Sequence, residues 1–181
     1  MSRWKGIVGE SFTKETFKAY VDTLSWEDDF VPEFIVLHNT GEPCLENRPN
    51  GLTHKHMKGL ESYYKNDMGW NSGPHLFIDD HQIWVFTPLT TSGVHSPSWN
   101  KVSLGVEMLG DFDTEEFDTG RGALVKDNSV AAIAILSKVL DIDPNTMKLH
   151  REDPRTDHHC PGDNVDKDEF ISLVLNNIVN Y

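Results

Sequence analysis

Short apolar runs of strand length alternate with segments of helical period along this chain, and this alternation constrains its fold most. The strand-like runs lie at 34–37, 75–79, 83–86, 102–108 and 147–150. Apolar residues at helical spacing predict helices over 13–24, 55–66, 129–140 and 167–178. Strands and helices that alternate loosely favour an α/β fold, in which helices flank both faces of a central mixed β-sheet.

Length and patterning predict one domain. The chain has 181 residues, enough to bury a sizeable core, and shows no internal repeat. We expect residues 1–181 to form a single domain, with residues 1–30 as an N-terminal helical extension packed on it.

The net charge argues against nucleic acid and membranes as partners. The formal net charge is −13, which repels phosphate backbones and anionic lipid, so neither nucleic acid nor membrane is an expected partner. No apolar run approaches the roughly 18 residues of a membrane helix, and no apolar stretch follows the first basic residues. We therefore expect synthesis in the cytoplasm without a signal peptide.

The two cysteines, Cys44 and Cys160, are too few for a disulfide framework.

Four polar residues stand at unusual places in the apolar pattern. His38 and His150 each end a predicted strand, Glu107 lies within another, and Cys160 follows His150 by ten residues. Ligands gather at strand ends along one edge of an open α/β sheet, so the two histidines and the cysteine are candidate ligands of one metal. Three protein ligands with one open position are typical of catalytic zinc. Glu107 beside such a metal would serve as the base that deprotonates water.

These four residues also have structural interpretations that involve no catalytic metal. A histidine at a strand end is commonly a hydrogen-bonded surface or core group, and Glu107 would then be an edge-strand carboxylate facing solvent. A structural zinc site would need a fourth protein ligand, and the spacing of the sequence requires none.

Four motifs then carry a family resemblance. "FIVLHNT" (34–40), "HLFID" (75–79), "SLGVEMLGDF" (103–112) and "LHREDPRTDHHCPG" (149–162) occur in the order and spacing of the zinc-dependent N-acetylmuramoyl-L-alanine amidases, a superfamily that includes phage lysozyme-type amidases and peptidoglycan recognition proteins. The resemblance covers about residues 34–180. It implies an amidase-like α/β fold and one Zn²⁺ per chain.

The resemblance assigns roles residue by residue. It implies that His38, His150 and Cys160 ligate zinc and that Glu107 is the general base. His158 takes the position of the Lys or Thr that stabilises the oxyanion in other members. Candidate substrate-binding residues are His95, in the turn ahead of the Glu107 strand, with Asn39 and Trp99.

Two departures from the family pattern affect the chemistry. Pro74 stands where many members have a tyrosine that assists catalysis, and its ring cannot replace the hydroxyl. His158 replaces a permanently charged lysine by a titratable side chain. The missing tyrosine shifts the expected burden of catalysis to Glu107, and His158 makes one catalytic charge depend on pH.

The remaining candidates have open or structural interpretations. Trp70 and Trp99 are expected in loops bordering the site, either stacking on sugar or packing in the core. His75 is a candidate neighbour of the metal ligands. We expect His54, His56 and His159 to face solvent, His81 to lie in a hairpin turn, and Cys44 to be a thiol near the groove rim.

The resemblance implies hydrolysis of the amide between N-acetylmuramic acid and L-alanine in peptidoglycan, by a monomer acting on peptidoglycan or muropeptides. A phage or prophage endolysin, released to the wall by a holin-type protein, is the expected role. A cytoplasmic amidase that recycles muropeptides is one alternative. A non-catalytic peptidoglycan-binding module is another, although such modules typically lose the cysteine ligand that this chain keeps as Cys160.

Overall fold

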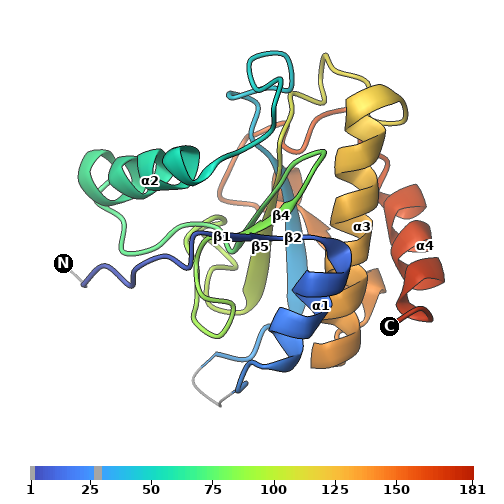
Figure 1. Ribbon diagram of the computed structural model, residues 1–181, viewed down its shortest axis with the longest axis horizontal. Coiled ribbons are helices and arrows are strands. Elements are labelled where there is room, and N and C mark those ends of the chain that lie inside the picture. The colour runs from blue at the N-terminus through green and yellow to red at the C-terminus, as the bar shows by residue number, and fades with distance from the viewer. Residues whose placement is uncertain (1–2, 27–29) are drawn as a thin grey trace.

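One mixed sheet organises the protein, whose computed structural model describes residues 3–26 and 30–181. The strand order is β1-β4-β3-β5-β2-β6. Figure 1 shows the sheet at the centre of the molecule, with α3 and α4 beside it. Strands β3, β5, β2 and β6 pair in parallel, and β4 and β1 complete one edge through antiparallel pairs. The strands are β1 Glu10–Phe12, β2 Phe34–Asn39, β3 Leu76–Ile78, β4 Ile83–Val85, β5 Ser103–Met108 and β6 Lys148–Leu149. The predicted mixed α/β sheet is confirmed.

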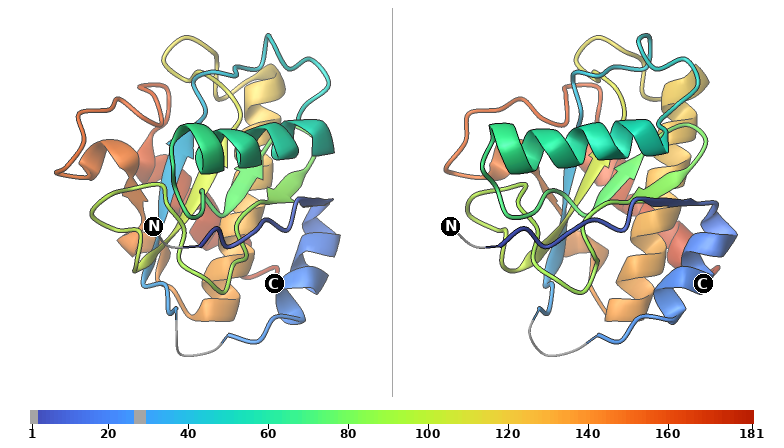
Figure 2. Two further views of the ribbon diagram at one scale, coloured as in Figure 1. Left: turned by 90° about the vertical axis from the view of Figure 1, so that its left-hand side faces the viewer. Right: turned by 60° about the vertical axis from the view of Figure 1, so that its left-hand side comes forward.

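Helices cover both faces of the sheet, as predicted. The helices are α1 Lys14–Asp22, α2 His54–Ser62, α3 Gly120–Leu140 and α4 Lys167–Ile178. Helix α3 packs on β3, β4 and β5, and α1 and α4 lie against α3. Helix α2 lies on the opposite side of the sheet and continues into a π-helical turn, Tyr63–Asp67 (Figure 2). Among the described residues, none of the helices has the length and apolar character to span a membrane.

Helix α3 is longer than the sequence predicts, because it begins at Gly120 and not near residue 129. Its first turns contain two glycines and several polar residues, a composition that resembles a loop. Gly122 is nevertheless required there, since a Cβ at this position would lie 1.9 Å from the carbonyl oxygen of Glu116. The missing side chain lets the first turn of α3 pass the preceding loop closely.

The N-terminal segment contributes both a strand and a helix. Strand β1 pairs with β4 at the edge of the sheet, and the fully buried Phe17 and Val21 anchor α1 on the core. The expected N-terminal extension also includes residues 1–2 and 27–29, which lie outside the described residues.

Parallel pairing brings the candidate site residues to one edge of the sheet. His38 in β2 is the register partner of Glu107 in β5, and Leu37 pairs with Leu149, the last residue of β6. His150 follows Leu149 directly. The carboxyl ends of three parallel strands therefore carry His38, Glu107 and His150, as expected for a ligand site in an open α/β sheet.

Candidate metal centre

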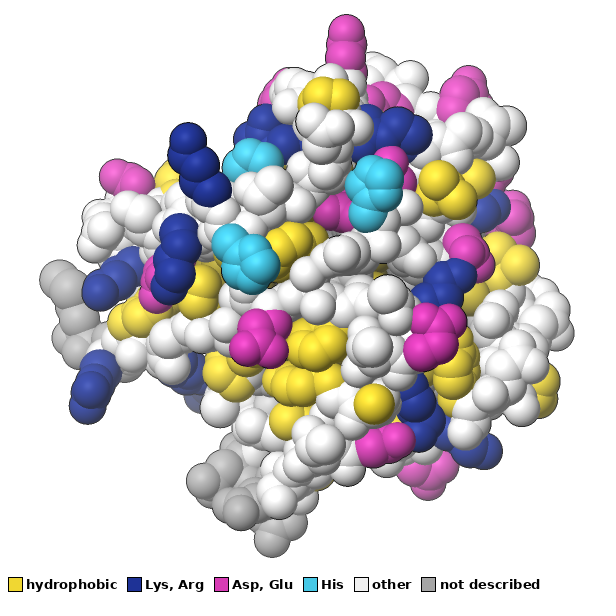
Figure 3. All heavy atoms as spheres, in the orientation of Figure 1, with side chains coloured by type: hydrophobic (Ala, Val, Ile, Leu, Met, Phe, Trp, Pro, Cys, Tyr) yellow, Lys and Arg dark blue, Asp and Glu magenta, His cyan; other side chains and the backbone are white. Residues whose placement is uncertain are grey.

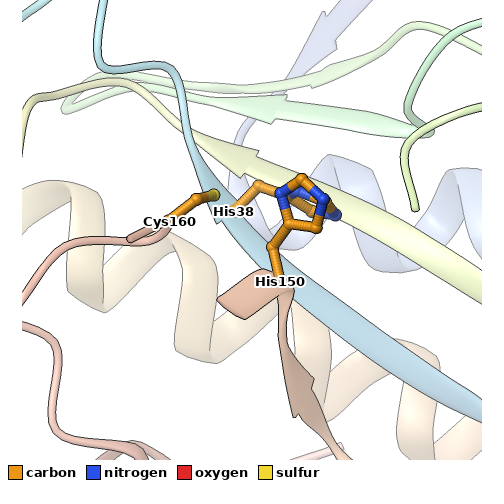
Figure 4. Close-up of side chains that lie close together, drawn as sticks. All are labelled: His38, His150 and Cys160. Carbon is orange, nitrogen blue, oxygen red and sulfur yellow. The ribbon is translucent and has the colours of Figure 1, made fainter. Parts of the chain in front are cut away.

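Three potential metal ligands converge at these strand ends. His38 comes from β2, His150 from the 3₁₀ turn His150–Glu152 after β6, and Cys160 from the loop before α4 (Figure 4). One potential ligand atom from each lies within 4.8 Å of those from the other two. His38 is buried, and His150 and Cys160 are half-buried.

Backbone hydrogen bonds hold Cys160 at the end of β2. The amide of Asn39 donates to the Cys160 sulfur over 3.3 Å, and the amide of Arg151 donates to the Cys160 carbonyl over 2.8 Å. The guanidinium of Arg151 also donates to the carbonyl of Gly162 at 2.9 Å. These contacts tie the loop that carries the thiol to both β2 and the turn that carries His150.

A hydrogen-bonded pair of imidazoles orients His38. Nε2 of His38 lies 3.1 Å from Nδ1 of His95, whose Nε2 faces the carbonyl of Ser103 at 3.4 Å. Because a carbonyl only accepts, His95 carries its proton on Nε2 and accepts from His38 at Nδ1. His38 therefore keeps the lone pair of its Nδ1, which lies 3.8 Å from Oε1 of Glu107.

Burial favours the neutral form of both rings. Desolvation lowers the pKa of His38 well below its usual value, and the nearby histidines lower it further. Desolvation also lowers the pKa of His95 to about 3. Two neutral imidazoles are consistent with the tautomers derived from the hydrogen bonds.

The donor set fits a zinc ion. Within the described chain, Nε2 of His150 is buried without a hydrogen-bond partner. Burial raises the pKa of the Cys160 thiol far above its usual range, and the charge of Glu107 adds to the rise. A borderline-soft cation such as Zn²⁺ binds imidazole nitrogen and thiolate sulfur and would offset the cost of burying these groups.

Glu107 lies in a central strand, so its interpretation as a solvent-facing edge carboxylate is wrong. Strand β5 is flanked by β3 and β2, and the Glu107 side chain is 14% exposed. Burial raises the pKa of its carboxyl group to about 8. A carboxyl group in this position can accept and return a proton.

A cavity of about 490 Å³, here called the metal-site cavity, opens beside these residues. Its lining includes all three candidate ligands, Glu107, Asn39 and His158. His158 is exposed, and its ring stacks on that of His150 with centroids 5.1 Å apart. The side-chain amide of Asn39 donates to the carbonyl of Gly110, so only part of Asn39 faces the cavity. His95 borders the cavity but is 7% exposed.

The two tryptophans have different environments. Trp70 lines the metal-site cavity, where it stacks on Tyr64 with ring centroids 5.2 Å apart. Trp99 is absent from that lining and packs edge-to-face on Phe34, at 5.8 Å between centroids. Phe34 begins β2, whereas His38 lies near its other end. The structure therefore does not bring Trp99 to the site where the sequence placed it.

His75 supports the sheet from inside the core. Its Nδ1 accepts from the amide of Gly105 at 2.9 Å, and its Nε2 donates to the carbonyl of Thr91 at 3.0 Å. It is fully buried, and burial lowers its pKa to about 4. As expected, His54 and His159 are exposed, and His81 lies in the turn between β3 and β4.

Tyr64 is a cavity residue that sequence reasoning missed. Its apolar spacing on the predicted helix indicated only a core position, but the π-helical turn after α2 directs it to the metal-site cavity. Burial raises the pKa of its hydroxyl well above the usual value, and the charge of Glu107 contributes. The hydroxyl therefore stays protonated at neutral pH.

Fold and site together define a class: an α/β domain with a candidate two-histidine, one-cysteine metal centre at the carboxyl ends of parallel strands. The family model for N-acetylmuramoyl-L-alanine amidase matches residues 28–163, and the chain belongs to this family.

Individual relatives agree with this assignment. Peptidoglycan-recognition protein SC2 of Drosophila simulans is 22% identical over 138 residues, which cover 73% of this chain and 69% of the relative. N-acetylmuramoyl-L-alanine amidase LysC from Clostridium intestinale URNW has a TM-score of 0.64 at 24% identity, covering 85% of this chain and 94% of that one. A mutant of Drosophila PGRP-LB in complex with tracheal cytotoxin has a TM-score of 0.62 at 21% identity, covering 91% and 84%. At these identities the structural matches show the fold.

Proposed function

We propose that the protein is a zinc-dependent amidase that hydrolyses the bond between N-acetylmuramic acid and L-alanine in peptidoglycan. One observation carries the proposal: potential ligand atoms of His38, His150 and Cys160 lie within 4.8 Å of one another, beside the largely buried carboxyl group of Glu107. Family membership and the peptidoglycan-recognition relatives support peptidoglycan as the substrate.

The chain's own residues suit each step of amide hydrolysis. Zn²⁺ held by His38, His150 and Cys160 would supply Lewis-acid chemistry at the cavity floor. Glu107 accepts a proton from the attacking water and delivers it to the departing alanine nitrogen. His158, exposed at the cavity, donates a hydrogen bond to the developing oxyanion.

Product analysis tests the reaction. Purified protein is incubated with isolated sacculi, with zinc and with a chelator, and the soluble products are identified by mass spectrometry. We expect stem peptides with a free N-terminal alanine, released only in the presence of metal, and about one zinc per chain. Cys160→Ser should lose zinc, because an alcohol does not ionise as a thiol does. Cleavage at any other bond, or full activity without metal, would overturn the proposal.

For the biological role we infer a phage endolysin, which the structural likeness to the endolysin amidase LysCS from Clostridium intestinale URNW supports. The alternative is an amidase that recycles muropeptides. An endolysin should release peptides from polymeric sacculi at least as efficiently as from soluble muropeptides, whereas a recycling enzyme should act on the soluble fragments alone. Comparing kcat/KM on the two substrates decides between the roles.

A non-catalytic binding module is the second candidate, since several relatives are peptidoglycan-recognition proteins. It predicts that the zinc-loaded protein binds muropeptide and releases no product. Retention of Cys160 in the candidate ligand set favours the enzyme.

A further inference from the structure

A second cavity lies between α2 and the loop that follows β2. Its volume is about 340 Å³, within the usual range for small-molecule sites. Leu52, Leu60 and Phe77 contribute apolar lining, and Arg48, Lys55 and His56 contribute basic groups. We call this cavity the cationic pocket.

In the part of the chain that the structure describes, the two cationic side chains of this pocket are not paired with acidic groups. Neither Arg48 nor Lys55 forms an ion pair with an acidic residue in the described ranges 3–26 and 30–181. The first turn of α2 also contains no acidic residue. Figure 3 shows Lys, Arg and His side chains gathered over α2 and the neighbouring loop. In a chain of net charge −13, this local excess of positive charge favours an anionic ligand.

Two polar atoms at the cationic pocket lack partners. Nε of Arg48 and Nδ1 of His56 are buried, and neither has a hydrogen-bond partner among the residues described. Burial lowers the pKa of His56, and the charges of Arg48 and Lys55 lower it further. The Nε–H of Arg48 is therefore a buried donor without a partner, which is costly, and a bound anion would satisfy it.

Side chains other than Arg48 fix the loop that carries it, and the Arg48 guanidinium itself donates to the carbonyl of the adjacent Asn47 at 2.9 Å. The guanidinium of Arg121 donates to the carbonyl oxygens of Leu45 and Arg48 at 2.5 and 2.7 Å. The carboxylate of Glu115 accepts from the amide of Leu45, and that of Asp79 accepts from the amide of Leu52. The pocket is therefore preorganised, and the Arg48 side chain can be changed without releasing the loop.

The cationic pocket adjoins the metal-site cavity. Thr40, Pro43, Leu60 and Phe77 line both. One extended ligand can therefore occupy both cavities, with its scissile amide near Glu107 and another part against Arg48.

We propose that the cationic pocket is a subsite for a carboxylate of the peptide stem, bound by Arg48 and Lys55 while the adjoining apolar wall packs on the aliphatic part of the stem. This inference rests on the proposed function, because the stem is the part of that substrate that carries free carboxylates.

Kinetics on matched substrates test the subsite. Soluble muropeptides are compared that differ only in whether their stem carboxylates are free or amidated. For the wild type, KM should be about 10-fold to 100-fold lower for the carboxylate form with kcat little changed, as expected for one charge-assisted hydrogen bond remote from the reacting atoms. Arg48→Gln should raise KM for the carboxylate form by a similar factor and abolish the preference. Lys101→Gln, which removes a positive charge from an exposed residue outside both cavities, should keep it.

The outcomes separate this inference from the proposed function. Hydrolysis with no preference, or equal effects of Arg48→Gln and Lys101→Gln, would overturn the subsite alone. If no muropeptide is hydrolysed, the proposed function fails, and calorimetric titration of the zinc-loaded full chain with free and amidated stem peptides still tests the subsite. Tighter binding of the free carboxylate by wild type than by Arg48→Gln would support it, and equal binding would overturn it.

Discussion

His95 supports His38 from the side opposite the candidate metal, through the 3.1 Å contact between His38 Nε2 and His95 Nδ1. Gly105 in β5 makes room for this arrangement, because a Cβ there would lie 2.4 Å from the His95 ring. The hydrogen bond fixes the proton of His38 on Nε2 and leaves the lone pair of Nδ1 available to a metal ion. Partners of this kind set both the tautomer and the ring orientation of metal ligands.

Replacing His95 should therefore weaken zinc binding. His95→Phe keeps a ring of similar size and removes both nitrogens, so we expect zinc affinity to fall about 10-fold to 100-fold. Competition with a chromophoric chelator measures it. His54→Phe, at an exposed histidine of α2, is the control and should leave the affinity unchanged. If His95→Phe instead raises KM at constant zinc affinity, His95 acts as the substrate contact that the sequence indicated.

Removing the proposed base should separate chemistry from metal binding. Glu107→Gln keeps the size of the side chain but cannot accept a proton, so kcat should fall by about 10²–10⁴. Zinc content, measured by atomic emission, should stay at one per chain. Glu116→Gln, at an exposed glutamate, should retain full activity. A Glu107→Gln variant with near-normal kcat would assign Glu107 a structural role.

The adjacent histidines should behave differently. His158→Ala removes the proposed oxyanion donor, and kcat should fall about 10²-fold while zinc affinity is kept. His158→Lys should retain most of the activity, because it restores the donor found at this position in other members of the family. His159 is also exposed but carries no assigned role, so His159→Ala is the matched control. Equal losses in the two alanine variants would contradict the role of His158.

Asp153 joins the loop after His95 to the turn after His150. Its buried carboxylate accepts from the hydroxyls of Ser96 and Ser98 and from the amides of Ser98 and Arg155. Burial opposes ionisation, but these hydrogen bonds outweigh it and hold the pKa of Asp153 well below its usual range. A lowered folded-state pKa stabilises the fold above the unfolded value of about 3.9, and this stabilisation is lost as pH falls below that value.

Asp153→Asn should therefore destabilise the protein most at pH values above about 4. We expect the free energy of unfolding of the metal-free protein to fall by about 2 kcal/mol at pH 7, with the deficit shrinking below about pH 4. Urea denaturation at pH 7 and at pH 3 measures the free energy of unfolding of both proteins. Asp157→Asn, at an exposed position in the same segment, should change little at either pH. A deficit that persists unchanged at pH 3 would show that packing, and not charge, explains the loss.

The sequence predicts the strands and the convergence of His38, Glu107 and His150 well, because both depend on local pattern. His38, Glu107 and His150 each lie in or directly after an apolar run, and parallel pairing of such runs places their ends together. Helix α4 occupies its predicted range, 167–178, because its apolar spacing is regular, and the structure adds that Asp166 caps it.

Features that depend on tertiary packing could not be predicted from the sequence. The start of α3 was missed because the close approach of Gly122 to Glu116 has no local signature. The hydrogen bond between His95 and His38 joins residues 57 positions apart. Trp99 was expected near the site, but its loop lies at the amino end of β2, where the ring packs on Phe34.

Tyr64 lines the metal-site cavity and carries a hydroxyl group. Pro74, which also lines this cavity and stands at the position of the family's tyrosine, has no hydroxyl. The ring is held by stacking on Trp70 and by an edge-to-face contact with Phe86, and both contacts survive in Tyr64→Phe. That variant should fold normally and lose about 10-fold in kcat, the effect of one neutral hydrogen bond to the reacting groups. Tyr63→Phe, whose parent side chain is 48% exposed, is the control and should keep its kcat. If Tyr64→Phe retains full kcat, Tyr64 only shapes the cavity wall, and Glu107 and His158 act without a tyrosine.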